Sequence, residues 1–263
     1  MNQAGHPVPV LEIAIASAAG AVAAQLGGAD RLELCNALEL GGVTPSAGLT
    51  ASVLAATELP VHVLIRPRPG DFCYDASEIG TAEHEAQLLA RQGAAGIVLG
   101  ALTGDGQIDV AATSRIIAAA KSVAPAVEIT FHKAFDQSAD PLPALQLLAG
   151  LGVDRVLSSG QAQRARDGIP VLSAMAAQRS GVQIMAGGGV LPADIADLSR
   201  LARVDAVHFS AKRPGPSAAN VGISLGSADG ADPNAYFVTD QALVRQARAE
   251  IAALAGAGQN SGQ

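Results

Sequence analysis

Short runs rich in Val, Ile and Leu alternate along the chain with longer Ala- and Leu-rich segments that have the apolar spacing of helices. The short runs predict β-strands at 10–15, 31–35, 61–66, 96–99, 127–132, 155–158, 183–186 and 206–210. The longer segments predict helices near 18–26, 48–57, 78–91, 109–121, 141–149, 163–179, 192–201 and 240–254. Strict alternation of eight strands with eight helices indicates parallel strands joined by crossover helices.

Glycine-containing joints recur where a predicted helix gives way to a predicted strand. They are Gly27-Gly28-Ala29-Asp30, Gln92-Gly93-Ala94-Ala95 and Leu151-Gly152-Val153-Asp154. A glycine at a helix end adopts the left-handed conformation and satisfies end carbonyl groups, so this repeat is typical of a βα unit. Eight such units in about 250 residues predict a single α/β domain, a (β/α)8 TIM barrel. An open doubly wound sheet is the alternative, but no G-x-G-x-x-G follows the first strand, which weakens its dinucleotide-binding form.

The predicted barrel domain covers residues 8–255. We expect the two ends of the chain, 1–7 and 256–263, to be flexible. The stretch 214–233 is rich in Gly, Ser, Ala and Pro, and it predicts a long, mobile last loop.

Composition excludes several classes of protein. Hydrophobic residues make up 49% of the 263 residues and the mean hydropathy is +0.29, which excludes a disordered chain. The net charge is −7, and no basic cluster is denser than Arg164 with Arg166, so we expect no nucleic-acid partner. Aromatic residues amount to 3% with no Trp, which makes stacking platforms for bases or sugars improbable.

Cysteine usage and the first residues bear on the compartment. Cys35 and Cys73 cannot form a disulfide framework and match no zinc spacing, which is typical of a reduced, cytoplasmic protein. The N-terminus lacks the positive start of a signal peptide, and no uncharged stretch is long enough to span a membrane. We therefore expect a cytoplasmic protein with no membrane partner.

Ionisable residues lie at the carboxyl ends of four predicted strands, which is where barrel enzymes carry their chemistry. Strand parity predicts that Glu12, Glu33, Arg66 and His132 meet inside the barrel mouth. One interpretation is a structural layer of salt bridges, and the other is a polar pocket with acid–base function. Asp136, four residues after His132, is a candidate to orient it or to share its acid–base role.

A second set of residues predicts a site for a small anion. Two arginines occupy a proline-stiffened loop at 66–75, where their alternative role is to pair with Asp71 and Asp75. Serines and glycines follow the sixth and seventh strands, where barrels commonly bind phosphate, although tight turning alone also explains them. The predicted anion-binding residues are Arg66, Arg68, Ser158, Ser159, Gly187, Gly188, Gly189 and Lys212.

The soft donors suggest a metal. Cys35 and Cys73 are candidate Cu(I) ligands with Met185 as a thioether, although buried cysteines are usually inert packing residues. Lys133 could form a Schiff base, but next to His132 it is expected to point the opposite way. His208 is assigned no role beyond that of a hydrogen-bonded histidine at a strand end.

Several segments in order resemble the CutC family, named for copper homeostasis, over nearly the whole chain. The segments are DRLELC at 30–35, GGVTPS at 41–46, IRPR at 65–68, GDFCY at 70–74, TFHKAFD at 130–136, VLSSG at 156–160 and IMAGGGV at 184–190. The resemblance implies a TIM barrel, a cytoplasmic location, a link to copper, and a homodimer or homotetramer. Many members carry adjacent cysteines where this chain has Ala14 and Ile15, and they usually have Arg where Lys133 stands.

Two functions remain open at this point. The first is a cytoplasmic copper-homeostasis protein that binds Cu(I) through Cys35 and Cys73. The second is a barrel enzyme, an isomerase, lyase or aldolase, that acts on a small phosphorylated or carboxylated substrate. Hard ionisable groups outnumber soft ligands at the predicted mouth, which favours an anion site.

Overall fold

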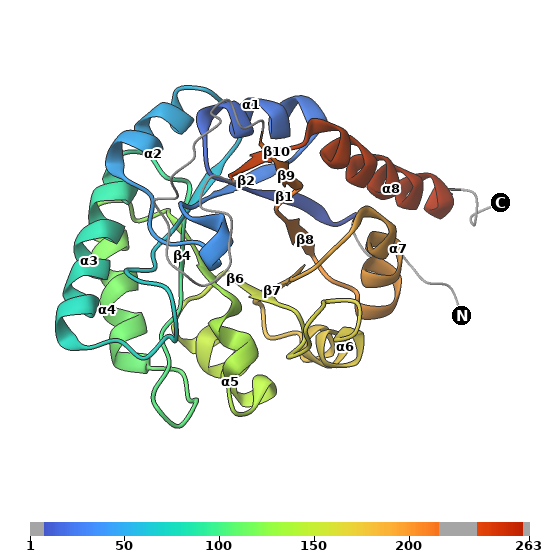
Figure 1. Cartoon of the computed structure of the whole chain (residues 1–263). Helices are drawn as coiled ribbons and strands as arrows, with labels where there is room; N and C mark the ends of the chain where they lie inside the picture. Colours follow the sequence, from blue (N-terminus) through green and yellow to red (C-terminus); the bar gives the residue numbers. More distant parts are fainter. Residues whose placement is uncertain (1–7, 216–235, 260–263) are drawn as a thin grey trace, which may run out of the picture.

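Eight parallel strands close into a barrel in sequence order, with helices arranged around its outside (Figure 1). The computed structural model describes residues 8–215 and 236–259, with side chains described as far as residue 255. The barrel strands are β1 (Val10–Ile15), β2 (Arg31–Leu34), β3 (Val61–Leu64), β4 (Gly96–Leu99), β5 (Glu128–Phe131), β6 (Arg155–Ser158), β7 (Gln183–Gly187) and β8 (Ala206–Phe209). The predicted fold class, a single (β/α)8 barrel, is confirmed.

Helices follow most strands. They are α1 (Ala18–Gly27), α2 (Ala47–Leu54), α3 (Ala76–Arg91), α4 (Val110–Lys121), α5 (Pro141–Gly150), α6 (Ile169–Ala177), α7 (Ile195–Asp197) and α8 (Gln241–Gln259). Short 3₁₀ segments η1 (Leu38–Leu40), η2 (Lys133–Gln137) and η3 (Pro192–Asp194) follow β2, β5 and β7. A small antiparallel pair, β9 (Lys212–Pro214) with β10 (Phe237–Thr239), follows β8. The predicted last loop, 214–233, falls outside the described residues apart from Pro214 and Gly215.

Two predicted helices are wrong in their start or continuity, and the helix predicted at 240–254 continues as α8 to Gln259, into the predicted flexible end. The helix predicted at 163–179 begins only at Ile169, because Gly168 packs on the backbone after β6, where an added Cβ would lie 1.9 Å from the Ser159 carbonyl oxygen. The helix predicted at 192–201 is divided into η3, the three-residue α7 and the π-helical η4 (Leu198–Ala202). Neither β6 nor β7 therefore leads directly into a regular helix.

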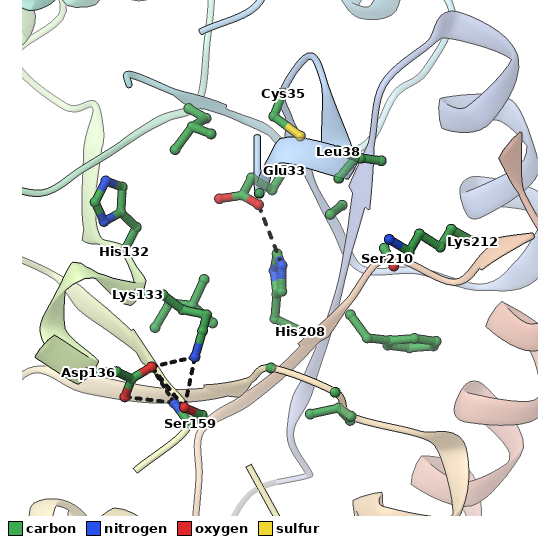
Figure 2. A pocket seen from close by; sticks show the side chains of 18 of the residues that line it. Glu33, Cys35, Leu38, His132, Lys133, Asp136, Ser159, His208, Ser210 and Lys212 are labelled. Atoms are coloured by element: carbon green, nitrogen blue, oxygen red, sulfur yellow. Dashed lines mark hydrogen bonds and ion pairs between the residues drawn. The ribbon is translucent and has the colours of Figure 1, made fainter. Parts of the chain in front are cut away.

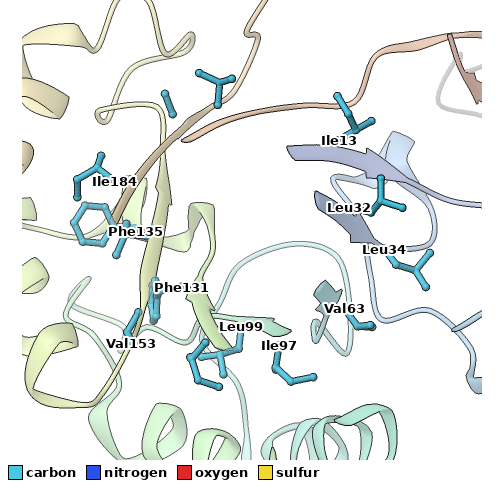
Figure 3. Packing of buried hydrophobic residues seen from close by; sticks show 14 of the residues in the cluster. Ile13, Leu32, Leu34, Val63, Ile97, Leu99, Phe131, Phe135, Val153 and Ile184 are labelled. Carbon is cyan, nitrogen blue, oxygen red and sulfur yellow. The ribbon is translucent and has the colours of Figure 1, made fainter. Parts of the chain in front are cut away.

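Alternate residues of each strand serve two different environments. One set packs between strands and helices in an apolar core that includes Ile13, Leu32, Leu34, Val63 and Ile184 (Figure 3). The other set points into the barrel, as strand periodicity requires. Charged residues belong to this inner set: Glu12 is fully buried, and Arg31 and Glu33 are nearly so.

The inner residues near the amino ends of the strands form a polar layer. Arg155 donates to Glu128, to Gln183 and to the Thr130 hydroxyl. His62 approaches Glu128, with Nε2 3.5 Å from a carboxylate oxygen. Burial lowers the pKa of His62 to about 4, so this imidazole is neutral at physiological pH. This layer closes the floor of the barrel.

Candidate functional site

A cavity of about 1110 Å³ opens at the carboxyl ends of the strands (Figure 2). Ten of the predicted or considered residues line it: Glu33, Cys35, Arg66, His132, Lys133, Asp136, Ser159, Gly188, Gly189 and Lys212. Five predicted residues lie outside its lining: Glu12, Arg68, Cys73, Ser158 and Gly187. The volume is at the upper end of the range found for small-molecule sites.

A chain of buried charged groups leads from the cavity into the barrel interior. His208 lies between two carboxylates: its Nδ1 is 2.8 Å from Glu12 Oε1, and its Nε2 is 3.5 Å from Glu33 Oε2. On its other side Glu12 accepts a hydrogen bond from Arg31 Nε. Figure 2 shows Glu33 and His208 facing each other at the centre of the cavity. From the cavity inward, the connected side chains are Glu33, His208, Glu12 and Arg31. The first two, Glu33 and His208, line the cavity.

These connected buried groups give the carboxyl groups of Glu33 and Glu12 different pKa values. Burial raises the pKa of Glu33 to about 7; the charge of His208 opposes this rise and that of Glu12 adds to it. Burial acts the same way on Glu12, but the hydrogen bond from His208 and the charge of Arg31 hold its pKa well below the usual range. Burial would lower the pKa of His208, yet the carboxylates of Glu33 and Glu12 outweigh burial and raise it. Near neutral pH, Glu33 is thus the group poised to gain or lose a proton.

The expected single cluster of Glu12, Glu33, Arg66 and His132 is wrong in its membership. Glu12 and Glu33 are joined through His208, whereas Arg66 and His132 bond elsewhere. His208, two residues after the inward-facing Ala206, has the strand parity of an inner residue, so the rule applied to the other strands would have found it. Arg31 was missed because it stands at the start of its strand and only residues at strand ends were considered, although the register places it beside Glu12.

Arg66 is held by backbone carbonyls. Its Nη1 donates to the carbonyls of Leu40 (3.1 Å) and Gly42 (2.8 Å), and its Nη2 donates to that of Gly70 (2.8 Å). The guanidinium lies 5.1 Å from the centre of the Phe72 ring. The Nε–H is buried without a partner. Arg66 therefore fixes the loops after β2 and β3 and keeps one unused donor.

His132 has a defined protonation state. Its Nδ1 accepts a hydrogen bond from the backbone N–H of Ala134, so the neutral ring carries its proton on Nε2. Burial, aided by the charge of Arg66, lowers its pKa to about 3. The Nε2–H is buried without a partner, and the ring packs 4.9 Å from that of Phe72. The ring also lies against Gly100, where a Cβ would come within 2.5 Å of it.

Asp136 accepts hydrogen bonds from the serines that were predicted to bind an anion. It accepts from the Ser158 hydroxyl (2.6 Å), the Ser159 hydroxyl (2.9 Å), and the backbone N–H groups of Ser159 and Gln161. Its carboxylate thus sits where a phosphate was expected to bind. The expected anion-binding role of Ser158 and Ser159 is therefore corrected: they hold the chain's own carboxylate.

Lys133 points into the cavity, contrary to expectation. Strand parity does not apply to it because η2 begins at this residue, directly after His132. Its Nζ donates to Asp136 and, at 2.8 Å, to the Ser159 hydroxyl (Figure 2). Its side chain is 41% exposed, so the ammonium group remains accessible to a ligand in the cavity.

The other residues predicted to bind an anion differ in whether they line the cavity. Arg68 is engaged by Glu78 (2.5 Å) and Asp71 (3.0 Å) outside the cavity. The contact with Asp71 is the alternative role predicted for an arginine of this loop, whereas Asp75 caps α3 and Glu78 pairs with Arg68 in its place. Lys212 lines the cavity with its Nζ 4.4 Å from the centre of the Phe237 ring. Gly188 (φ 109°) and Gly189 (φ 60°) form a left-handed turn in the lining, but the three-residue η3 after it offers no helix N-terminus for an anion.

The structure does not bring the soft donors together. Cys35 is buried in the lining, and burial together with the charges of Glu33 and Glu39 raises its thiol pKa. Cys73 is exposed in the loop after β3, and Met185 is buried below, 3.5 Å from an Arg31 nitrogen. Within residues 8–215 and 236–259, no three His, Cys, Asp or Glu side chains are arranged to hold a metal ion. The Cys35–Cys73 pair is therefore a poor fit to Cu(I).

The fold and the site define a TIM-barrel protein with a cavity lined by ionisable side chains at the carboxyl ends of its strands. The model of the family described as "CutC family" matches residues 9–213. The chain therefore belongs to this family, which confirms the resemblance. A relative from Histophilus somni, described as family protein CutC, is 42% identical over 220 residues, which cover 82% of this chain and 89% of the relative. A relative from Chromobacterium violaceum with the same description is 40% identical over 243 residues, which cover 91% of this chain and 96% of the relative. The structure of a candidate copper homeostasis protein CutC from Streptococcus agalactiae has a TM-score of 0.70 at 27% identity, covering 76% of this chain and 97% of that one. In the described part of the chain no helix is long and apolar enough to cross a membrane.

Proposed function

We propose that this protein is an acid–base enzyme that moves a proton on a small, carbonyl-containing anion, as an isomerase or lyase does. The observation that carries the proposal is Glu33, a cavity-lining carboxyl group whose pKa is raised to about 7. A general base is most effective when its pKa lies near the working pH. A merely structural carboxylate would be stabilised in its charged form, as Glu12 is.

The neighbouring groups supply the other parts of such a reaction. The Glu33 carboxylate takes a proton from the carbon next to the carbonyl. The electron pair of that C–H bond becomes the C=C bond of an enolate, and the π pair of the C=O bond moves onto the oxygen. His132 and Arg66 line the cavity, and each keeps one buried N–H without a partner that would have to turn toward that oxygen to donate to it. Return of the proton from Glu33 to the same carbon exchanges its hydrogen. Return to the former carbonyl carbon, with the proton of a neighbouring hydroxyl group moving to the enolate oxygen, gives the isomer, so no oxidant or cofactor is consumed.

Cations in the lining favour an anionic substrate. Lys133 and Lys212 both line the cavity, and Lys133 keeps much of its side chain exposed although Asp136 and Ser159 hold it. Asp136 neutralises part of the charge of Lys133 and holds its ammonium group in place, which makes Asp136 a positioning residue. The substrate's carboxylate or phosphate would be held by these ammonium groups.

Proton exchange with solvent tests the proposal without knowledge of the natural substrate. In D₂O the protein should catalyse deuterium incorporation next to the carbonyl of at least one probe among pyruvate, oxaloacetate and glycolaldehyde phosphate, followed by proton NMR. Glu33→Gln should slow this exchange about 10²–10⁴-fold, the usual contribution of a general base. Glu39→Gln removes an exposed carboxylate of the same region and serves as the control. Equal exchange by wild type and Glu33→Gln would exclude Glu33 as the base.

A second candidate function is copper homeostasis, which the description of the S. agalactiae structure names. The observation in its favour is the thiol of Cys35 in the cavity lining. Cu(I) is then a cargo bound through a single sulfur. This role would place the protein in the cytoplasm, where thiols stay reduced, as the homodimer or homotetramer that the family resemblance implies.

Copper binding has its own test. One Cu(I) should bind per chain in competition with a chelator, and Cys35→Ser should abolish binding while Cys73→Ser retains it. The apparent affinity should rise about tenfold per pH unit, because the bound thiol must lose its proton and burial raises its pKa. Retention of Cu(I) by Cys35→Ser, or an affinity independent of pH, would contradict binding at this thiol.

A further inference from the structure

A second cavity, of about 710 Å³, lies at the opposite end of the barrel from the mouth. It is bounded by the carboxyl end of α6, the start of β7 and the end of η4. Apolar residues such as Met175, Val182 and Ile184 form its buried floor. Its size is within the range of small-ligand sites.

Three arginines line this cavity: Arg179, Arg200 and Arg203. None of them forms an ion pair or side-chain hydrogen bond in the described part of the chain, whereas arginines elsewhere, such as Arg115 and Arg155, bind carboxylates. Asp205 is the acidic residue of the described lining, and one of its oxygens already accepts from the Ile184 N–H at 2.8 Å. The cavity rim is therefore strongly positive in a protein of net charge −7.

The backbone gives an independent reason to regard these arginines as more than ordinary surface residues. Arg179 (φ 48°) and Arg203 (φ 55°) both adopt the left-handed conformation. At the helix ends before β2, β4 and β6 the left-handed residue is a glycine, namely Gly28, Gly93 and Gly152. A side chain is disfavoured in this conformation, and such strain often accompanies a binding function. Both disfavoured positions adjoin the same cavity.

We infer that this cavity binds a small polyanion, a compound bearing phosphate or several carboxylates, through Arg179, Arg200 and Arg203. Guanidinium groups offer paired N–H donors that match the oxygens of phosphate and carboxylate. The site lies at the amino ends of the strands, away from the catalytic mouth of a barrel, so it is a binding site with no part in the reaction. It stands independently of the function proposed for the mouth.

Inorganic pyrophosphate is the probe for the test, with titration calorimetry as the readout. Wild-type protein should bind pyrophosphate in this cavity with a submillimolar Kd at physiological salt, and Lys133→Gln, which removes a cation of the mouth, serves as the background in which this site is counted as one per chain. The double variant Arg179→Gly, Arg203→Gly should weaken binding at least tenfold, while its Tm stays equal to or rises above that of wild type because glycine relieves the left-handed backbone. A retained Tm shows that lost binding does not reflect unfolding.

Two further variants decide between a built site and general charge attraction. Arg91→Gln removes an exposed arginine on α3 and should leave the Kd unchanged. Lys133→Gln separates the two sites: it should weaken pyrophosphate binding at the mouth alone, so the binding that it retains and that the double variant loses belongs to the second cavity. A wild-type Kd above 10 mM, or equal weakening by Arg91→Gln and by the double variant, would overturn the inference.

Discussion

Glu12→Gln should lower the free energy of unfolding by about 3–5 kcal/mol. Glu12 is fully buried, accepts from Arg31, and is bonded to His208 at 2.8 Å. A glutamine would leave the Arg31 guanidinium buried without a counter-ion, and removing one partner of a buried pair is far more damaging than replacing both. For a chain of this size the loss corresponds to a fall in Tm of roughly 6–20 °C.

An exposed pair supplies the matched control. Glu83 on α3 binds Arg115 on α4 at 2.7 Å, and the Arg115 side chain is half exposed. Glu83→Gln should change stability by less than about 1 kcal/mol, because solvent screens such pairs. Equal losses for Glu12→Gln and Glu83→Gln in urea unfolding would show that the interior charge chain does not stabilise the barrel.

Glu33→Gln should have the opposite effect on stability above neutral pH. The pKa of Glu33 in the folded protein is raised to about 7, against an ordinary value of 4.5. An acid with a raised pKa binds its proton more tightly in the folded state, so its contribution to stability falls as pH rises from about 4.5 to 7. The accumulated loss is roughly 2–4 kcal/mol above pH 7, and a neutral glutamine removes it.

The difference between variant and wild type cancels the titrating groups that do not interact with Glu33, such as His62 and His132, and retains Glu33 together with its coupled neighbour His208. His208, whose pKa is also raised, contributes in the same direction, while His62 and His132, with lowered pKa values, act in the opposite one. Subtracting wild-type from Glu33→Gln stability at each pH leaves a gain that grows between about pH 4.5 and pH 7 and is constant above that. The control Glu39→Gln should give a flat difference. A flat difference for Glu33→Gln as well would mean that its carboxyl group titrates normally.

The barrel itself could be predicted from the sequence because strand parity and helix spacing are local properties. The predicted strands agree with the observed ones to within two residues at either end. The helix predicted at 163–179 failed because Gly168 packs against the backbone after β6, a contact between separate parts of the fold that helical spacing does not contain. The π-helical η4 was missed for a similar reason.

Many residues of the candidate site were predicted from the sequence, but the contacts between them were not. Parity placed Glu33 and His132 inside the mouth, but it could not show that His208 joins Glu33 to Glu12, because that depends on how the barrel closes β8 onto β1. Parity also misdirected Lys133, since it ceases to apply where η2 replaces the strand. The carboxylate of Asp136 fills the expected phosphate position, a long-range contact that no local motif reveals.

The pKa of Glu33 is the quantity on which the proposed function depends most directly. Carbon-13 NMR of the side-chain carboxyl groups, with the Glu33 signal identified by its absence in Glu33→Gln, measures it in the intact protein. The account predicts a titration midpoint near 7, set by burial and the charge of Glu12. A midpoint near 4, with Glu33 fully ionised throughout the neutral range, would contradict the account and leave the mouth of the barrel without its acid–base group.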